Sequence, residues 1–131
     1  MSETKKTTQN NDRINSIKLT DNNGIISAPG NVYELDFNRD AIRFAENRGF
    51  KIEEVQDYPV SKMPELFYYS FRMHNRSVAK DKTDKLIEAW GGALPESVLR
   101  RLIELYNQAQ LSNSIQFDEE AEKNGAVTVE L

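Results

Sequence analysis

Apolar and polar residues alternate in two short stretches near the N-terminus, at residues 17–20 and 32–37. A period of two is typical of strands that bury one face, so both stretches are predicted to be β-strands. Between them, Asn23-Gly24 is a strong hairpin-turn signal, because both residues tolerate positive φ. Ile25-Ile26 then begins a predicted return strand, which a second turn at Pro29-Gly30 cuts short. We therefore expect a small antiparallel sheet or hairpin of two or three strands.

The segment after the second strand carries the signals of a helix. Asn38 can cap its start, and Asp40 lies in the first turn, where the helix dipole favours negative charge. Gly49 is predicted to end the helix in the left-handed conformation and to fold Phe50 back onto the last turn. The sequence thus predicts a helix between Asn38 and Gly49.

Three further helices are predicted after a connector at residues 51–59. Their expected spans are Ser61 to His74, Thr83 to Trp90, and Pro95-Glu96 to Leu111. Gly91-Gly92 is interpreted as a helix stop. The expected fold class is α+β, with a small N-terminal antiparallel sheet or hairpin packed on a bundle of about four helices.

The chain has 131 residues, which suits one compact domain with polar ends. Residues 1–13 contain one apolar residue, Met1, and residues 112–125 contain only three. Segments of this composition cannot bury enough apolar area to offset the entropy of ordering them. We expect a disordered arm at residues 1–13, a single α+β domain at 14–111 and an acidic flexible tail at 112–131.

The charge balance argues against nucleic acid as a partner. Basic residues number 17 and acidic residues 21, for a net charge of −4, whereas a nucleic-acid binder normally presents a basic face. The basic residues between Arg72 and Lys85 are interrupted by Asp81 and Asp84, and they are interpreted as a solvated helix end and loop. No apolar run is long enough to span a membrane, and no signal peptide is recognisable. The lack of cysteine fits a reducing cytoplasm.

Side chains that could carry out chemistry are few. His74 is the only histidine, and because no nucleophile or second ligand accompanies it, it is interpreted as a packed, hydrogen-bonded side chain. The carboxylates at Glu53-Glu54 and at residues 118–122 lie in predicted loops or tails, which cannot hold two acids rigidly across a cleft. Gly91-Gly92 lacks the lysine and spacing of a phosphate-binding loop. The sequence predicts no catalytic residue, no cofactor and no metal site, so the protein is not expected to be an enzyme.

The second predicted helix is apolar nearly all round, which places it either at the centre of the core or at an interface. Phe67 and Phe71 are interpreted as core residues, whereas Tyr68 and Tyr69 are the amphipathic kind that anchors interfaces. The candidate partner-binding residues are Leu66, Tyr68, Tyr69, Arg72, Met73 and Trp90.

The order of several motifs resembles a known family. The motifs are VYELDFNR at residues 32–39, ENRGF at 46–50 and PVSKMPELFYYSFRMH at 59–74, followed by the helix around 102–106. They are similar to a family of small proteins from siphophages of Gram-positive hosts, catalogued as of unknown function and thought to include tail assembly chaperones. The chain departs from the family pattern at Asn75, where a second histidine is usual.

The resemblance implies a chaperone that coats the phage tape measure protein and helps to recruit subunits of the major tail protein. It implies action in the host cytoplasm during assembly, absence from the mature virion and a possible homo-oligomer. Two alternatives stay open. The protein is then either a structural virion component, such as a head–tail connector or tail terminator, or a host-directed regulatory binding protein.

Overall fold

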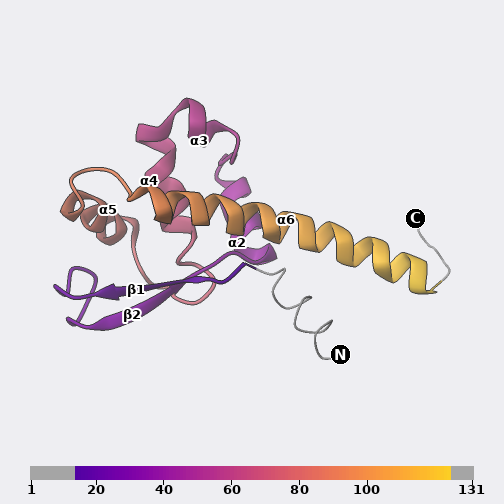
Figure 1. Ribbon diagram of the computed structural model, residues 1–131, viewed down its shortest axis with the longest axis horizontal. Coiled ribbons are helices and arrows are strands. Elements are labelled where there is room, and N and C mark those ends of the chain that lie inside the picture. The colour runs from indigo at the N-terminus through magenta and orange to yellow at the C-terminus, as the bar shows by residue number, and fades with distance from the viewer. Residues whose placement is uncertain (1–13, 125–131) are drawn as a thin grey trace.

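A computed structural model of the protein describes the backbone of residues 14–124 and the side chains of residues 14–111 (Figure 1). A two-stranded antiparallel hairpin precedes the helices, so the predicted α+β class is confirmed. The elements in chain order are β1 (Ile17–Asp21), β2 (Asn31–Leu35), α2 (Arg39–Asn47), α3 (Glu54–Asp57), α4 (Pro59–Tyr69), α5 (Lys80–Ala89) and α6 (Glu96–Asn124). The arm expected at residues 1–13 and the end of the expected tail at 125–131 lie outside the described residues.

The hairpin pairs Ile17 with Leu35 at its open end and Asp21 with Asn31 next to the loop. The predicted return strand at Ile25-Ile26 does not form, and these residues belong to the loop instead. The reason is Asp21, whose buried carboxylate accepts hydrogen bonds from the backbone N–H groups of Ile25 (2.8 Å) and Ile26 (2.7 Å). Those donors are therefore not available for strand pairing.

Helix α2 forms where the local signals place it. The side chain of Asn38 accepts a hydrogen bond from the N–H of Ala41 at 2.8 Å and so caps the first turn. Gly49 has φ +86°, and the N–H of Phe50 donates to the carbonyl of Ala45, so the chain turns back on the helix end. Phe50 is thereby buried, as predicted.

The boundaries of α4 differ from those predicted. The helix begins at Pro59, because proline is favourable at the first helical position, and the expected connector contains the single turn α3. The helix ends at Tyr69 rather than at His74, because the carbonyl of Ser70 accepts a hydrogen bond from the backbone N–H of Asp36 at 3.0 Å. A bond to the end of β2 thus takes the carbonyl that a continuing helix would use.

Helix α5 begins at Lys80, three residues before the predicted Thr83. Two consecutive glycines end it, with Gly91 at φ +92° and Gly92 at φ +98°. Helix α6 begins at Glu96 as predicted, and its backbone runs to Asn124, past the predicted helix end at Leu111. The sequence from 96 to 124 contains no glycine or proline that would break it.

The core lies where α6 meets the hairpin and the other helices. In the view of Figure 1, α6 crosses the molecule between the hairpin and α3, and its C-terminal half extends beyond the other elements. A helix of 29 residues is about 43 Å long. Within residues 14–124, no helix has the length and apolar character that crossing a bilayer requires. The aromatic core residues with less than one-tenth of their surface exposed are Tyr33, Phe37, Phe50, Phe67, Tyr69, Phe71 and Tyr106.

We predict that Asp21→Asn destabilises the fold by about 1–3 kcal/mol at pH 7, because an amide cannot replace both accepted hydrogen bonds. Burial raises the pKa of Asp21, but the backbone N–H groups of the loop outweigh it and lower the pKa below its ordinary value. This contribution to the free energy of unfolding is therefore present above about pH 4 and is lost as the pH falls through the lowered pKa.

Urea denaturation at pH 7 and pH 3 measures the free energy of unfolding of Asp21→Asn and of the unmodified protein. The difference between the two free energies should be smaller at pH 3 than at pH 7. Asp57→Asn is the matched control, because Asp57 is exposed on α3. A gap of equal size at both pH values would contradict the role assigned to the Asp21 carboxylate.

Candidate partner-binding surface

Two of the six candidate partner-binding residues lie in the core. Leu66 has no exposed surface, and Tyr69 is 5% exposed. The ring of Tyr69 packs edge-on against Phe50, with centroids 5.2 Å apart, and against Phe44 at 5.9 Å. These contacts stabilise the fold, and Leu66 and Tyr69 lie in the core and not at the surface of the folded domain.

Tyr68, Arg72 and Met73 are half-buried at the surface of the domain. Tyr68 packs against Phe44 with centroids 6.4 Å apart, and the Cζ atom of Arg72 lies 3.9 Å from the centroid of the same ring. The Cζ of Arg48 lies 4.3 Å from it. The two arginine side chains therefore cover, through cation–π contacts, the part of the Phe44 ring that packing between α2 and α4 leaves unburied.

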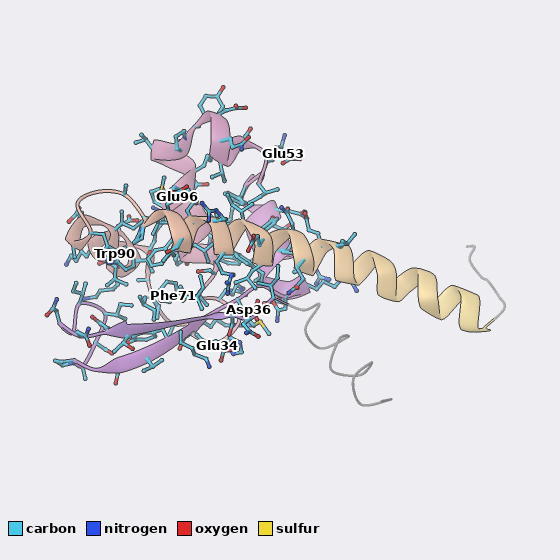
Figure 2. All side chains as sticks on the ribbon, viewed as in Figure 1. Glu34, Asp36, Glu53, Phe71, Trp90 and Glu96 are labelled. Carbon is cyan, nitrogen blue, oxygen red and sulfur yellow. The ribbon has the colours of Figure 1, made fainter. Side chains whose placement is uncertain are left out.

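Trp90 lies apart from that group. Its ring packs edge-on against Phe67 at 5.7 Å, and 37% of its surface is exposed (Figure 2). With Leu19 and Ile25 it lines a shallow groove of about 180 Å³ between α5 and the hairpin loop. Tyr68 and Arg72 line a separate hollow of about 10 Å³. The structure thus does not bring Trp90 into one site with them.

The most exposed apolar side chains of the helical part were not among the sequence candidates. Tyr58 is 60% exposed and Val60 is 90% exposed, at the corner between α3 and α4. Leu111 on α6 is 61% exposed. The sequence signal for this exposed corner is Pro59. It begins a helix where the chain reverses direction, and within residues 14–124 no other element covers the residues next to it.

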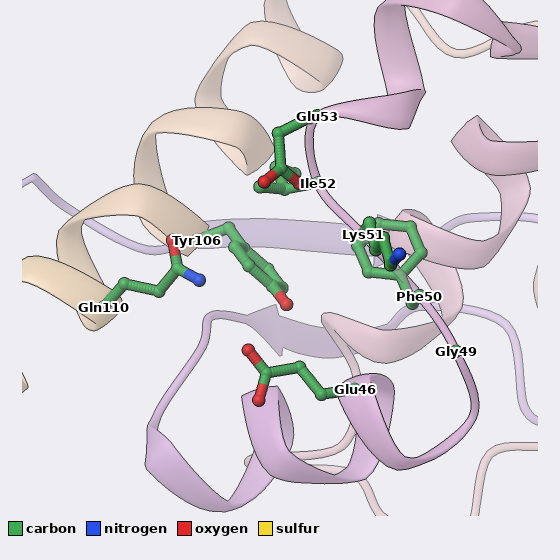
Figure 3. A pocket seen from close by; sticks show the side chains of 8 residues that line it. All are labelled: Glu46, Gly49, Phe50, Lys51, Ile52, Glu53, Tyr106 and Gln110. Atoms are coloured by element: carbon green, nitrogen blue, oxygen red, sulfur yellow. The ribbon is translucent and has the colours of Figure 1, made fainter.

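A concave region lies between α2, the connector at residues 49–53 and α6, and we call it the α2–α6 groove. It consists of two adjoining hollows of about 400 and 330 Å³, which share Glu46 and Gln110. Figure 3 shows the first of them. The first is also lined by Gly49, Phe50, Lys51, Ile52, Glu53 and Tyr106, and the second by Arg39, Ile42 and Arg43.

The two hollows of the α2–α6 groove differ in charge. Glu46 and Glu53 flank Tyr106 in the first hollow, whereas Arg39 and Arg43 face the second. Burial, reinforced by the negative charges of Glu46 and Glu53, raises the pKa of Tyr106 to about 12. The phenol therefore stays protonated at neutral pH and keeps its hydrogen for donation. The α2–α6 groove can thus recognise a surface that carries both charges.

Three potential metal ligands that the sequence did not suggest as a group lie together elsewhere. The ligand atoms of Glu34, Asp36 and His74 are all within 4.8 Å of one another. His74 is about one-third exposed, with its Nε2 3.7 Å from Glu34 Oε2. The hydroxyl of Ser16 donates to the same Oε2 at 2.8 Å, so a carboxylate and not the imidazole accepts its hydrogen bond. The group is not arranged to activate Ser16 as a nucleophile.

Comparison with known proteins identifies a family. The model of the family described as a domain of unknown function (DUF5055) matches residues 4–131, so the chain belongs to that family. No curated protein and no solved structure matches it.

The adjacent tyrosines of α4 offer a matched pair of substitutions. Tyr69→Ser should lower the free energy of unfolding by about 3–5 kcal/mol, because it removes a buried ring. Tyr68→Ser should lower it by about 1 kcal/mol, because that ring is half-buried. Thermal or urea denaturation of the two variants measures the difference, and equal losses would contradict the assignment of Tyr69 to the core.

Proposed function

We propose that this member of the DUF5055 family is a non-enzymatic protein-binding domain that acts as a phage tail assembly chaperone. In this role it coats the tape measure protein and helps to recruit subunits of the major tail protein. It acts in the host cytoplasm during assembly and is not retained in the mature virion. The observation that carries the proposal is the α2–α6 groove, together with the half of α6 that extends past the core.

The shape of the α2–α6 groove supports a helical client. Helices α2 and α6 and the connector at residues 49–53 line it, and side chains of a client helix can enter hollows of about 400 and 330 Å³. The buried rings of Phe50 and Tyr106 give the first hollow a firm apolar floor, and Glu46, Lys51 and Glu53 give it a polar rim. A small apolar centre within a polar rim is the usual anatomy of a reversible protein interface.

The charges of the α2–α6 groove support one orientation of the client. A helix with basic side chains towards Glu46 and Glu53 and acidic side chains towards Arg39 and Arg43 would be complementary. Reversing the helix would place like charges together, which disfavours that register. A long client could thus be coated by successive copies in one direction.

The extension of α6 supports a client longer than the α2–α6 groove itself. Residues 112–124 continue the helix for about 20 Å beyond Leu111. The exposed side chain of Leu111 stands where the helix leaves the core and offers an apolar contact at that point. A client helix seated in the groove can therefore continue along α6.

We predict that Glu46→Lys weakens binding of a tape measure protein fragment by about tenfold or more, because Glu46 faces both hollows. The full chain and the fragment are co-expressed and purified, and their affinity is measured by calorimetry. Glu88→Lys on α5 is the matched control, because it makes the same charge change at an exposed helical position outside the groove.

Two results would overturn the proposal in different ways. If both variants bind the fragment as the unmodified chain does, the α2–α6 groove is not the client site. If mass spectrometry of purified particles finds the protein in stoichiometric copies, it is a structural virion component and not a chaperone.

A further inference from the structure

Two segments far apart in the chain bring the only histidine next to two carboxylates. Glu34 lies near the end of β2 and Asp36 directly after it (Figure 2). His74 lies in the turns that follow α4. We propose that Glu34, Asp36 and His74 form a binding site for one divalent transition-metal ion. The site is separate from the α2–α6 groove, and the inference does not depend on the chaperone function.

The spacing of the three donors is close to that of a metal centre. Zinc binds histidine nitrogen and carboxylate oxygen at about 2.0–2.2 Å, so two ligands of a tetrahedral site are about 3.4 Å apart. The Nε2 of His74 is 3.7 Å from Glu34 Oε2, and no pair among the three ligand atoms exceeds 4.8 Å. The side chain of His74 is about one-third exposed, so it can rotate towards the two carboxylates and shorten the remaining distance.

The surrounding hydrogen bonds hold the donors in place. The Asp36 N–H donates to the carbonyl of Ser70 at 3.0 Å, and the side-chain amide of Asn75 donates to the carbonyl of Glu34 at 3.4 Å. Both bonds tie β2 to the segment that carries His74. Ser16 holds the Glu34 carboxylate, and the N–H of Phe37 donates to Asp36 Oδ1 at 2.7 Å. Such outer contacts orient the ligands of metal centres.

The donor set selects the kind of ion. One imidazole and two carboxylates suit Zn²⁺ or Mn²⁺, whereas Mg²⁺ and Ca²⁺ prefer oxygen ligands alone. Asp36 is 5% exposed and would bind the ion from the side of the protein interior. His74 and Glu34, which are more exposed, would bind it from the side of the solvent. A bound ion would cross-link the hairpin to the chain after α4, so its effect is on stability.

The test uses the full chain without an affinity tag, because a polyhistidine tag would bind the same metals. Calorimetry with ZnCl₂ and MnCl₂ should show one saturable site, and the melting temperature should rise with the ion. Since the chain has a single histidine, its imidazole NMR signals report on this residue alone. We expect Zn²⁺ to shift these signals and Mn²⁺ to broaden them.

Variants at the exposed ligands keep the test independent of folding. His74→Ala and Glu34→Gln should each weaken binding at least about tenfold without lowering the melting temperature of the metal-free protein. Glu88→Gln on α5 is the control and should bind as the unmodified chain does. Binding that is unchanged in His74→Ala would place the ion on other carboxylates and overturn the proposal. Absence of binding by the unmodified chain at millimolar Zn²⁺ and Mn²⁺ would overturn it as well.

Discussion

The ring of Tyr106 joins three parts of the chain in the core. It meets Phe37, just after β2, with centroids 5.0 Å apart, and Phe50, just after α2, at 5.7 Å. Both contacts are edge-on, the geometry that aromatic pairs prefer. Phe50 continues the series to Tyr69 of α4 at 5.2 Å. One side chain of α6 thereby fixes the end of the hairpin and both ends of α2, and the other helices pack around this arrangement.

The same contacts shape the α2–α6 groove. Tyr106 and Phe50 are core residues, yet they also form the floor of the first hollow (Figure 3). A binding surface built on buried rings keeps its shape, because their positions are set by packing and not by a flexible loop. The rim residues Glu46 and Gln110 project from helices, so they can be changed without disturbing the core. Stability and the proposed recognition of a client therefore depend on different atoms of one region.

The sequence predicted what local signals determine. Asn38 and Gly49 bounded α2 correctly, because capping and left-handed glycine act within one turn of the chain. The end of α4 was missed because it is determined by a bond between Ser70 and Asp36, which are distant in sequence. Likewise the α2–α6 groove depends on which faces of two helices meet, and no periodicity within either helix specifies that. Tertiary packing overrides the local pattern at such places.

The structure also shows what the aromatic residues of α4 pack against, which the sequence pattern alone does not determine. A helix that is apolar nearly all round indicated either the centre of the core or an interface. In the structure Tyr69 is buried, and the guanidinium groups of Arg48 and Arg72 cover Phe44. The exposed apolar side chains of the helical part are instead scattered, as with Val60 near the start of α4 and Leu111 midway along α6. Scattered apolar side chains bind a partner less permanently than one continuous apolar face, which would favour aggregation. In the proposed chaperone role the protein releases its client when the tail subunits arrive, and this scattered distribution is consistent with such reversible binding.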